Sequence, residues 1–169
     1  MRNRHDILLA IDDSEASRMA VLYVAAVARG APHFRIRLLH VLPHIPTHLL
    51  EHGGAEDPDD ERRLSRELDE GTARWRRRCE AAATSLLDEV RDTLESGGVA
   101  GERITIEFAA PLPEESIGIH ILRAAAEGPC DTVVVGRSPR SWLAGKLHRS
   151  PSKALLRGRA PGVAIWIVT

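Results

Sequence analysis

The chain is poor in cysteine and in aromatic residues, and it carries almost no net charge. Its 169 residues include two cysteines, Cys79 and Cys130, which form no CxxC pair and are too few for a disulfide framework. A formal net charge of −1 creates no global field that would attract nucleic acid or an anionic membrane. We therefore expect a protein of the reducing cytoplasm with no nucleic-acid partner.

Long hydrophobic runs are missing as well. The longest, "MAVLYVAAVA" at 19–28, has ten residues, about half of what a membrane-spanning helix needs. The run near the N-terminus, "ILLAI" at 7–11, is too short for a signal peptide. With 43% hydrophobic and 28% charged residues, the balance is that of a globular protein, and the length fits a single domain, 1–169. No membrane partner is expected.

Apolar runs and amphipathic stretches alternate along the chain. The apolar runs predict strands, and the stretches between them, with capping residues at their ends, predict helices. Strands are expected at 6–12, 33–41, 103–109, 131–136 and 162–169, and helices at 14–30, 60–96, 113–128 and 150–158. This order is typical of an α/β protein with a doubly wound, five-stranded parallel sheet and helices on both faces.

Two of the helices show apolar faces. The helix at 14–30 has Ser14 as its N-cap and Gly30 just past its end. Its buried face is expected to hold Met19, Leu22, Tyr23, Ala26 and Val27. The helix at 60–96, for which a break near Gly71 is an open alternative, is expected to bury Trp75, Cys79, Ala82, Leu86, Val90 and Leu94. Its "RWRRR" stretch is interpreted as a solvated face, because acids flank it.

The segment 42–60 is expected to be a long loop, because it holds three prolines, two glycines and an acid cluster. Histidines recur every four residues in this region, at His40, His44, His48 and His52. Two prolines interrupt the run, so only His48 and His52 could share a helical face, and incidental loop histidines are the preferred interpretation. No metal is predicted, and the role of the insertion 43–70 stays open.

The candidate site lies where the strands end. In parallel sheets, ligands bind beyond the carboxyl ends of the strands, where the strand order reverses. The relevant ends are Asp12, Asp13 and Ser14 after the first strand, Val41 after the second and Gly136 after the fourth. These residues are far apart in the sequence and are expected to converge. Ser14 is interpreted as an N-cap rather than as a nucleophile, since no G-x-S-x-G surrounds it.

Three stretches resemble the universal stress protein family. They are "ILLAIDDSEASRMAVLYVAAVA", "LLHVLP" and "DTVVVGRSPRSWLAGKLHRSPSKALLRGRAPGVAIWIV", and the resemblance covers essentially the whole chain in order. It implies a Rossmann-like fold of the adenine nucleotide alpha hydrolase type with strand order 3-2-1-4-5. It also implies a stress-response and signalling module that acts by binding rather than as an enzyme.

Nucleotide-binding members of that family carry the motif G-x2-G-x9-G-[ST]. On this chain the motif falls on Gly136, Pro139, Arg149 and Ser150, so the loop has become G-x2-P-x9-R-S. Proline has no N–H to donate to a phosphate, and arginine adds a large side chain where the motif has none. Asp13 also replaces the glycine that usually follows the first Asp. The loop therefore resembles a degenerate phosphate loop.

Other features of the loop favour a retained ligand. The resemblance implies that Asp12 contacts the adenine or ribose end of a nucleotide and that the backbone of Val41 meets the base. Ser150 would cap a helix whose N-terminus faces an anion, and the basic side chains could replace lost amide donors. The candidate nucleotide-binding residues, for ATP or AMP, are Asp12, Asp13, Ser14, Val41, Gly136, Arg137, Ser138, Arg149, Ser150 and Ser152. Two hypotheses remain, a nucleotide-responsive module and a degenerate pocket whose dimer acts through unknown protein partners.

The last strand predicts the oligomeric state. "VAIWIV" at 163–168 is apolar on both of its alternating faces, so an uncovered edge here would invite aggregation. Pairing with the same strand of a second chain would cover that edge around a two-fold axis. We therefore expect a homodimer through 163–168, which is also how members of the resembled family commonly assemble.

Overall fold

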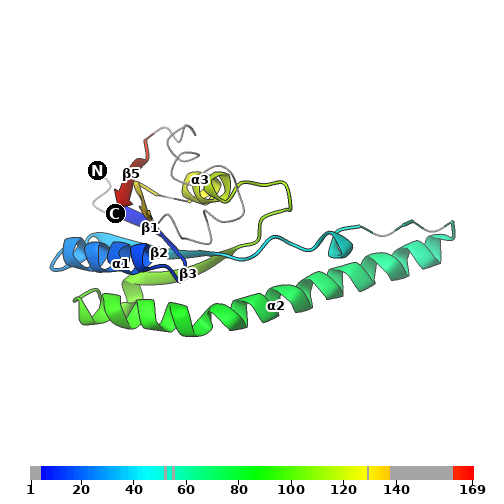
Figure 1. The fold of residues 1–169 in the computed structure, drawn as a ribbon, viewed down its shortest axis with the longest axis horizontal. Coiled ribbons are helices and arrows are strands. Elements are labelled where there is room, and N and C mark those ends of the chain that lie inside the picture. Colours follow the sequence, from blue (N-terminus) through cyan, green and yellow to red (C-terminus); the bar gives the residue numbers. More distant parts are fainter. Residues whose placement is uncertain (1–4, 52, 55, 129, 138–161) are drawn as a thin grey trace.

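A five-stranded parallel sheet forms the centre of the protein (Figure 1). The computed structural model describes residues 5–51, 53–54, 56–128, 130–137 and 162–169. The strands are β1 His5–Ile11, β2 Phe34–Val41, β3 Ile104–Ala109, β4 Thr132–Gly136 and β5 Ala164–Val168. Every pairing is parallel, and the order is β3-β2-β1-β4-β5, which confirms the predicted doubly wound topology.

Helices cover both faces of the sheet. They are α1 Glu15–Ala28, α2 Pro58–Ser96 and α3 Ile117–Glu127, with two short 3-10 helices, η1 Thr47–Leu49 and η2 Gly101–Arg103. Helices α1 and α2 pack side by side on one face, and α3 lies on the other (Figure 1). The helix expected at 150–158 falls outside the described residues. No described helix is both long enough and apolar enough to cross a bilayer.

The central strand β1 is buried on both faces. Ile7, Leu9 and Ile11 join the cluster under α1 and α2, while Leu8 and Ala10 join the cluster under α3. β1 also pairs with β2 along one edge and with β4 along the other, and its residues from Ile7 to Ile11 are buried. A strand that is covered on both faces requires a continuous apolar run. This run explains why both ends of β1 were predicted to within one residue.

The apolar face predicted for α1 was wrong. Met19, Leu22 and Tyr23 are each about half exposed, at 47%, 53% and 47%. The buried face consists of smaller residues: Ala16, Ser17, Ala20, Val21, Val24, Ala25 and Ala28. Small side chains allow the axis of α1 to come close to the sheet. The short distance between helix and sheet, and not side-chain hydrophobicity, therefore determines which face of α1 is buried.

Helix α2 runs through Gly71 without a break. A Cβ at Gly71 would lie 3.0 Å from Leu49 Cδ2, so the glycine leaves room for η1 to pack on the helix. The Thr72 hydroxyl donates a hydrogen bond to the Leu49 carbonyl over 3.0 Å. The predicted loop 42–60 therefore contains η1, which rests on α2, and the helix begins at Pro58. Asp57 caps that helix start by accepting from the Asp59 N–H.

Residues 43–78, which we call the arm, project beyond the sheet (Figure 1). The stripe predicted for α2 is correct at Val90 and Leu94, but Trp75, Cys79 and Leu86 are only partly buried. Ala82 is exposed, and its neighbour Ala83 is buried instead. The arm has no sheet beneath it, so its side chains cannot reach full burial.

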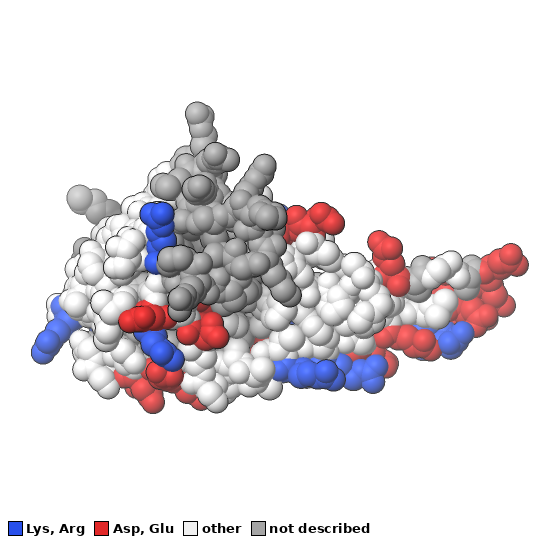
Figure 2. Space-filling view, in the orientation of Figure 1, with Lys and Arg blue, Asp and Glu red and all other residues white. Residues whose placement is uncertain are grey.

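Charged side chains dominate the surface of the arm. Figure 2 shows acidic side chains gathered at its free end. Arg62 pairs with Asp59, and Arg63 pairs with Asp60 at 3.1 Å and Glu67 at 2.9 Å. Such i,i+3 and i,i+4 pairs give a solvated helix a few tenths of a kcal/mol each, roughly 0.2–0.5. The four arginines of "RWRRR" are exposed, as predicted.

Helix α3 starts four residues later than predicted, because the residues before it form a turn. The Glu115 N–H donates to the Leu112 carbonyl over 2.9 Å, and the Leu112 N–H donates to Glu115 Oε2 over 3.0 Å. Glu115 also accepts from His120 Nε2 at 2.5 Å and from Arg123 Nη2 at 3.1 Å. Its carbonyl contacts His44 Nε2 at 3.0 Å, so the start of α3 is tied to the base of the arm.

The Leu112 N–H, together with His120 and Arg123, lowers the pKa of Glu115 to about 2 from its ordinary 4.5. A carboxyl group whose pKa is lower in the folded chain than in the unfolded chain stabilises the fold at every pH above its unfolded-state pKa. This stabilisation is lost as the pH falls from about 4.5 toward about 2. We expect the melting temperature of Glu115→Gln to lie below that of the wild type at pH 7, with a gap that narrows across this window. Thermal melts from pH 7 to pH 2 measure the gap.

Glu114→Gln is the matched control, because Glu114 is exposed and makes no ion pair in the described part of the chain. Its melting temperature should track the wild type at every pH. A Glu115→Gln gap that stays constant from pH 7 to pH 2 would contradict the role assigned to the ionised carboxylate.

Gly136 allows the end of β4 to touch the first turn of α1. A Cβ on Gly136 would lie 2.3 Å from both the carbonyl carbon and the carbonyl oxygen of Ala16, and 2.6 Å from the Ser17 nitrogen. All three are backbone atoms, so no side-chain rotation could relieve the overlap. The glycine is thus required by packing, whatever the loop after it binds.

Gly136→Ala should lower the free energy of unfolding by roughly 1–3 kcal/mol, the usual range for forcing extra atoms into a packed region. Urea denaturation followed by circular dichroism measures this change. Gly53→Ala serves as the control, because a Cβ there would meet nothing within 4 Å. Equal stability of the two variants would refute the close contact.

Candidate functional site

The turn between β1 and α1 is closed by hydrogen bonds among its own polar groups. Asp12 is only 3% exposed, and its Oδ1 accepts from the Ser14 N–H at 3.1 Å and from the Ser14 hydroxyl at 2.5 Å. The Ser14 Oγ accepts from the Ser17 N–H at 3.1 Å, which is the predicted N-cap contact. The Ser17 hydroxyl in turn accepts from the Asp12 N–H at 3.1 Å. Asp13 is exposed beside this network.

The end of β2 lies beside this turn. The pairing of β1 with β2 ends at Ile11 and His40, so Val41 lies one residue beyond it. The Val41 side chain is 2% exposed and packs in the cluster under α3. On its other side Val41 still pairs with Ala109 of β3. Val41 therefore lies at the edge of the sheet next to Asp12, where the topology predicts a ligand site.

His40 belongs to the same edge, although the sequence pattern favoured an incidental role for this histidine. Its Nδ1 lies 3.1 Å from the Ile11 carbonyl oxygen, and its ring meets Phe108 edge-on at 6.2 Å. Burial lowers the pKa of His40, against the opposing effects of the Ile11 carbonyl and of the Asp12 and Asp13 charges. A neutral ring with its proton on Nδ1 donates to that carbonyl, which ties β2 to the last residue of β1.

The end of β4 completes the edge. Ser17 contacts the Asp12 N–H and lies against Gly136, so the turn and the end of β4 share one residue of α1. Arg137 follows; its N–H donates to the Val168 carbonyl over 2.7 Å, and the residue is exposed. The structure thus brings Asp12, Ser14, Val41 and Gly136 to one edge. The other candidates, Ser138, Arg149, Ser150 and Ser152, lie outside the described residues.

A small cavity opens beneath the turn, between α1 and α2. Its volume is about 180 Å³, below the range of about 300–1,000 Å³ that is usual for small-molecule sites. Among the described residues of its wall, Asp12 and Glu89 are carboxylates and Arg18 is a guanidinium. Leu86, Val90 and Thr93 of α2 complete the lining together with residues of α1. No sequence motif pointed to this cavity, because its α2 residues lie about 75 positions from Asp12.

The histidines of the arm do not form a metal site in the described part of the chain. His48 is exposed and lies in η1, which ends at Leu49. Pro46 occupies the N-cap position of η1, where Thr47 was expected. His52 lies outside the described residues. No group of three or more His, Cys, Asp or Glu side chains among the described residues is arranged to hold a metal ion.

Cys130 is buried, and its thiol donates to the Thr132 carbonyl over 3.2 Å. Burial raises the pKa of this thiol and also that of Cys79, which is only partly buried. Both cysteines are therefore protonated thiols at neutral pH, and neither has the lowered pKa of a nucleophile.

Comparisons with solved structures agree with this architecture. A universal stress protein family member from Burkholderia pseudomallei has 20% identity and a TM-score of 0.57, covering 99% of this chain and 98% of that chain. A universal stress protein in complex with cAMP has 17% identity and a TM-score of 0.60, covering 98% and 96%. One from Archaeoglobus fulgidus in complex with dAMP has 13% identity and a TM-score of 0.50, covering 100% of both chains.

At these identities the structural likeness establishes the fold alone. A search of the curated proteins gave no match. The family assignment comes from the sequence itself, because the model of the universal stress protein family matches residues 3–159. This match includes the β1–α1 turn, the ends of β2 and β4 and the loop that follows β4. The chain therefore belongs to the universal stress protein family.

Proposed function

We propose that this chain is a homodimeric stress-response and signalling module of the cytoplasm that acts by binding, without turnover, and whose nucleotide loop is degenerate. The observation that carries the proposal is the state of Asp12. This acid, which the family resemblance assigns to the adenine or ribose end of a nucleotide, is 3% exposed and accepts two hydrogen bonds from Ser14. A carboxylate held in this way closes a turn and has little surface left for a ligand.

Three further features support a degenerate pocket. The retained Gly136 has a packing reason that needs no phosphate, namely its contact with Ala16. Pro139 and Arg149 replace the two central glycines of the family loop. The described lining of the adjoining cavity of about 180 Å³ holds two carboxylates against the single guanidinium of Arg18, a balance that disfavours a phosphate.

The second candidate function is ATP or AMP binding through Asp12, Val41, Gly136 and Ser150. It is favoured by the two similar structures that hold cAMP and dAMP. It is also favoured by Val41, which lies beyond the last β1–β2 pair and beside the turn. Basic residues of the loop would then replace the amide donors lost with the glycines.

Restoration of the family loop separates the two candidates. We expect the wild type to release no nucleotide on denaturation and to give no saturable calorimetric signal with ATP-Mg²⁺ at millimolar concentration. The double variant Pro139→Gly with Arg149→Gly rebuilds the motif G-x2-G-x9-G-S and should bind ATP at least tenfold more tightly, because backbone N–H donors and room for the phosphates return.

Arg140→Gly is the control for this measurement, since it removes one positive charge from the same loop without restoring the motif. It should behave as the wild type does. Saturable binding of ATP or AMP by the wild type at micromolar concentration would reject the degenerate loop and favour the second candidate.

The homodimer is proposed to form through β5. This strand lies at one end of the sheet order, and no described strand pairs with its outer edge. Ala164 is exposed, while the other strand residues are partly buried, and Trp166 meets Tyr23 edge-on at 5.8 Å. An apolar strand with a free edge is stabilised by pairing with a second copy.

The cytoplasmic location is proposed from the two cysteines. Both are free thiols in the structure, and proteins of oxidising compartments more often pair theirs.

Trp166→Glu should convert the dimer to a monomer in size-exclusion chromatography with light scattering, because a buried charge at the interface is left unpaired. Trp166 also packs on the core of its own chain, so Ala164→Glu, at an exposed position of β5, provides a second test that spares the fold. Ile119→Glu, on the exposed side of α3, should leave the mass unchanged. Persistence of the dimer in both β5 variants would reject this interface.

A further inference from the structure

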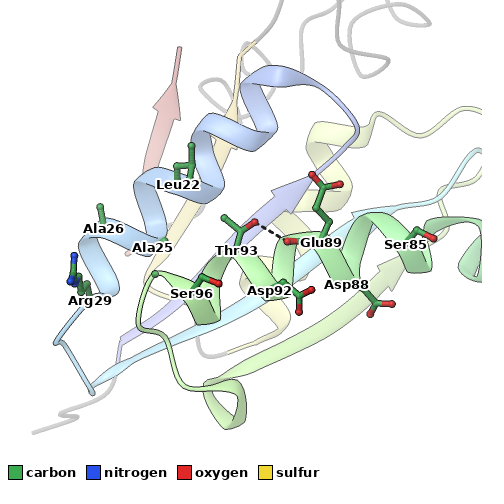
Figure 3. Close-up of a pocket in the computed structure, with 11 residues that line it drawn as sticks. Leu22, Ala25, Ala26, Arg29, Ser85, Asp88, Glu89, Asp92, Thr93 and Ser96 are labelled. Atoms are coloured by element: carbon green, nitrogen blue, oxygen red, sulfur yellow. Dashed lines mark hydrogen bonds between the residues drawn. The ribbon is translucent and has the colours of Figure 1, made fainter.

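Helices α1 and α2 leave an open groove between them on the surface away from the sheet (Figure 3). Its volume is about 920 Å³, and it adjoins the smaller cavity beneath the β1–α1 turn, with which it shares Leu22, Glu89 and Thr93. Both helices run from the carboxyl edge of the sheet toward its opposite edge. The lining runs along α2 from Ser85 to Ser96, which is about 16 Å at 1.5 Å per residue.

The floor of the groove is made of small residues. Ala25 of α1 lies opposite Gly97, which follows α2 directly, and Ala26 also lines the groove. A Cβ on Gly97 would lie 2.7 Å from Ala25 Cβ, so the two helices meet closely at this point. Small side chains at the bottom of a groove leave room for the bulky side chains of an occupant.

One wall of the groove is apolar. Leu22 is 53% exposed, the most exposed of the five large hydrophobic side chains that the described residues leave in solvent. Met19 and Tyr23, on the same outer face of α1, are two of the others. Most of the exposed large apolar surface of the described chain is therefore gathered on one helix, and such clustering marks binding surfaces.

The other wall of the groove is acidic. Asp88 and Asp92 project from one side of α2, one turn apart, and Glu89 projects from another side of the same helix (Figure 3). Asp88 and Asp92 make no ion pair in the described part of the chain, while Glu89 meets Arg18 only at 4.0 Å. Among the described residues that line the groove, three are carboxylates, and Arg29 is the one cation.

We propose that this groove binds a basic amphipathic helix of a partner protein, about three turns long. Its apolar side chains would pack on Leu22 and the alanine floor, and two cations one turn apart would face Asp88 and Asp92. Charge complementarity selects this occupant, because the acidic wall disfavours an anionic membrane and an acidic peptide. This inference rests on the partner-binding role proposed above. It adds the surface that binds the partner, which is the α1–α2 groove, and the chemistry of the partner segment, which is a basic amphipathic helix.

A fluorescein-labelled, fourteen-residue amphipathic helix of leucine and lysine is the probe, titrated against the full chain by fluorescence anisotropy. The wild type should bind it saturably. Asp88→Lys with Asp92→Lys should weaken binding at least tenfold, and Leu22→Ala at least threefold. All three positions are exposed, so circular dichroism should show an unchanged fold.

Two matched controls test whether the binding is local to the groove. Asp69→Lys with Glu70→Lys makes the same change in charge on the arm, and Ile119→Ala trims an exposed apolar side chain on α3. Both should bind the probe within about twofold of the wild type. The same peptide with glutamate in place of lysine should not bind.

Absence of probe binding by the wild type would overturn the proposal, as would an equal loss in Asp69→Lys with Glu70→Lys. Self-association of the wild type that disappears in Asp88→Lys with Asp92→Lys would assign the groove to a second copy and would also overturn it. The groove variants leave Asp12, Val41, Gly136 and the loop after β4 unchanged, and the probe contains no nucleotide. Failure here is thereby distinguishable from failure of the degenerate loop.

Discussion

The arrangement of the domain depends on a backbone contact between the end of β4 and the first turn of α1. Gly136 and Ala16 approach so closely that no side chain fits between them. This contact draws α1 onto the sheet, and only small side chains such as Ala20 and Ala25 fit the narrow space beneath the helix. The larger apolar side chains of α1, Leu22 among them, are consequently directed to solvent. One packing constraint thus accounts for the core face of α1 and for the apolar wall of its outer groove.

The same contact fixes the candidate site. Because α1 starts against Gly136, the turn before it must close tightly, and Asp12, Ser14 and Ser17 close it with four hydrogen bonds among themselves. Buried polar groups of this kind are stable only when they are paired, and these four hydrogen bonds supply such pairing within the turn. Features that could be taken for a nucleotide fingerprint, an acid at a strand end and a glycine after β4, therefore also serve the fold. The proposed contacts with macromolecules therefore lie elsewhere on the described surface, at the groove and at the edge of β5.

Much of this architecture follows from the sequence, for identifiable reasons. A continuous apolar run at 7–11 and the triple valine of β4 can only be central strands, and the strand order came from the family resemblance. The buried face of α1 was mispredicted because Leu22 and Tyr23 are more hydrophobic than alanine and were therefore assigned to the core. The close approach of α1 to β4 leaves room only for smaller side chains, so Leu22 and Tyr23 lie on the exposed face. The start of α3 was missed because Glu115 bonds back to Leu112 and forms a turn where the pattern suggests a helix.

The site was harder to anticipate than the fold. Strand ends alone pointed to Asp12, Val41 and Gly136, and the structure brings them to one edge. The roles of His40 and Glu89 depend on contacts across 29 or more residues, which no local pattern encodes.

The central claim is that the β1–α1 turn of this family member is a closed structural element and not a nucleotide site. Amide chemical shifts of the isotope-labelled protein during titration with AMP to millimolar concentration test it most directly. The account predicts that the N–H signals of Ser14, Ser17, Val41 and Gly136 do not move. Saturable shifts at these four amides would contradict it.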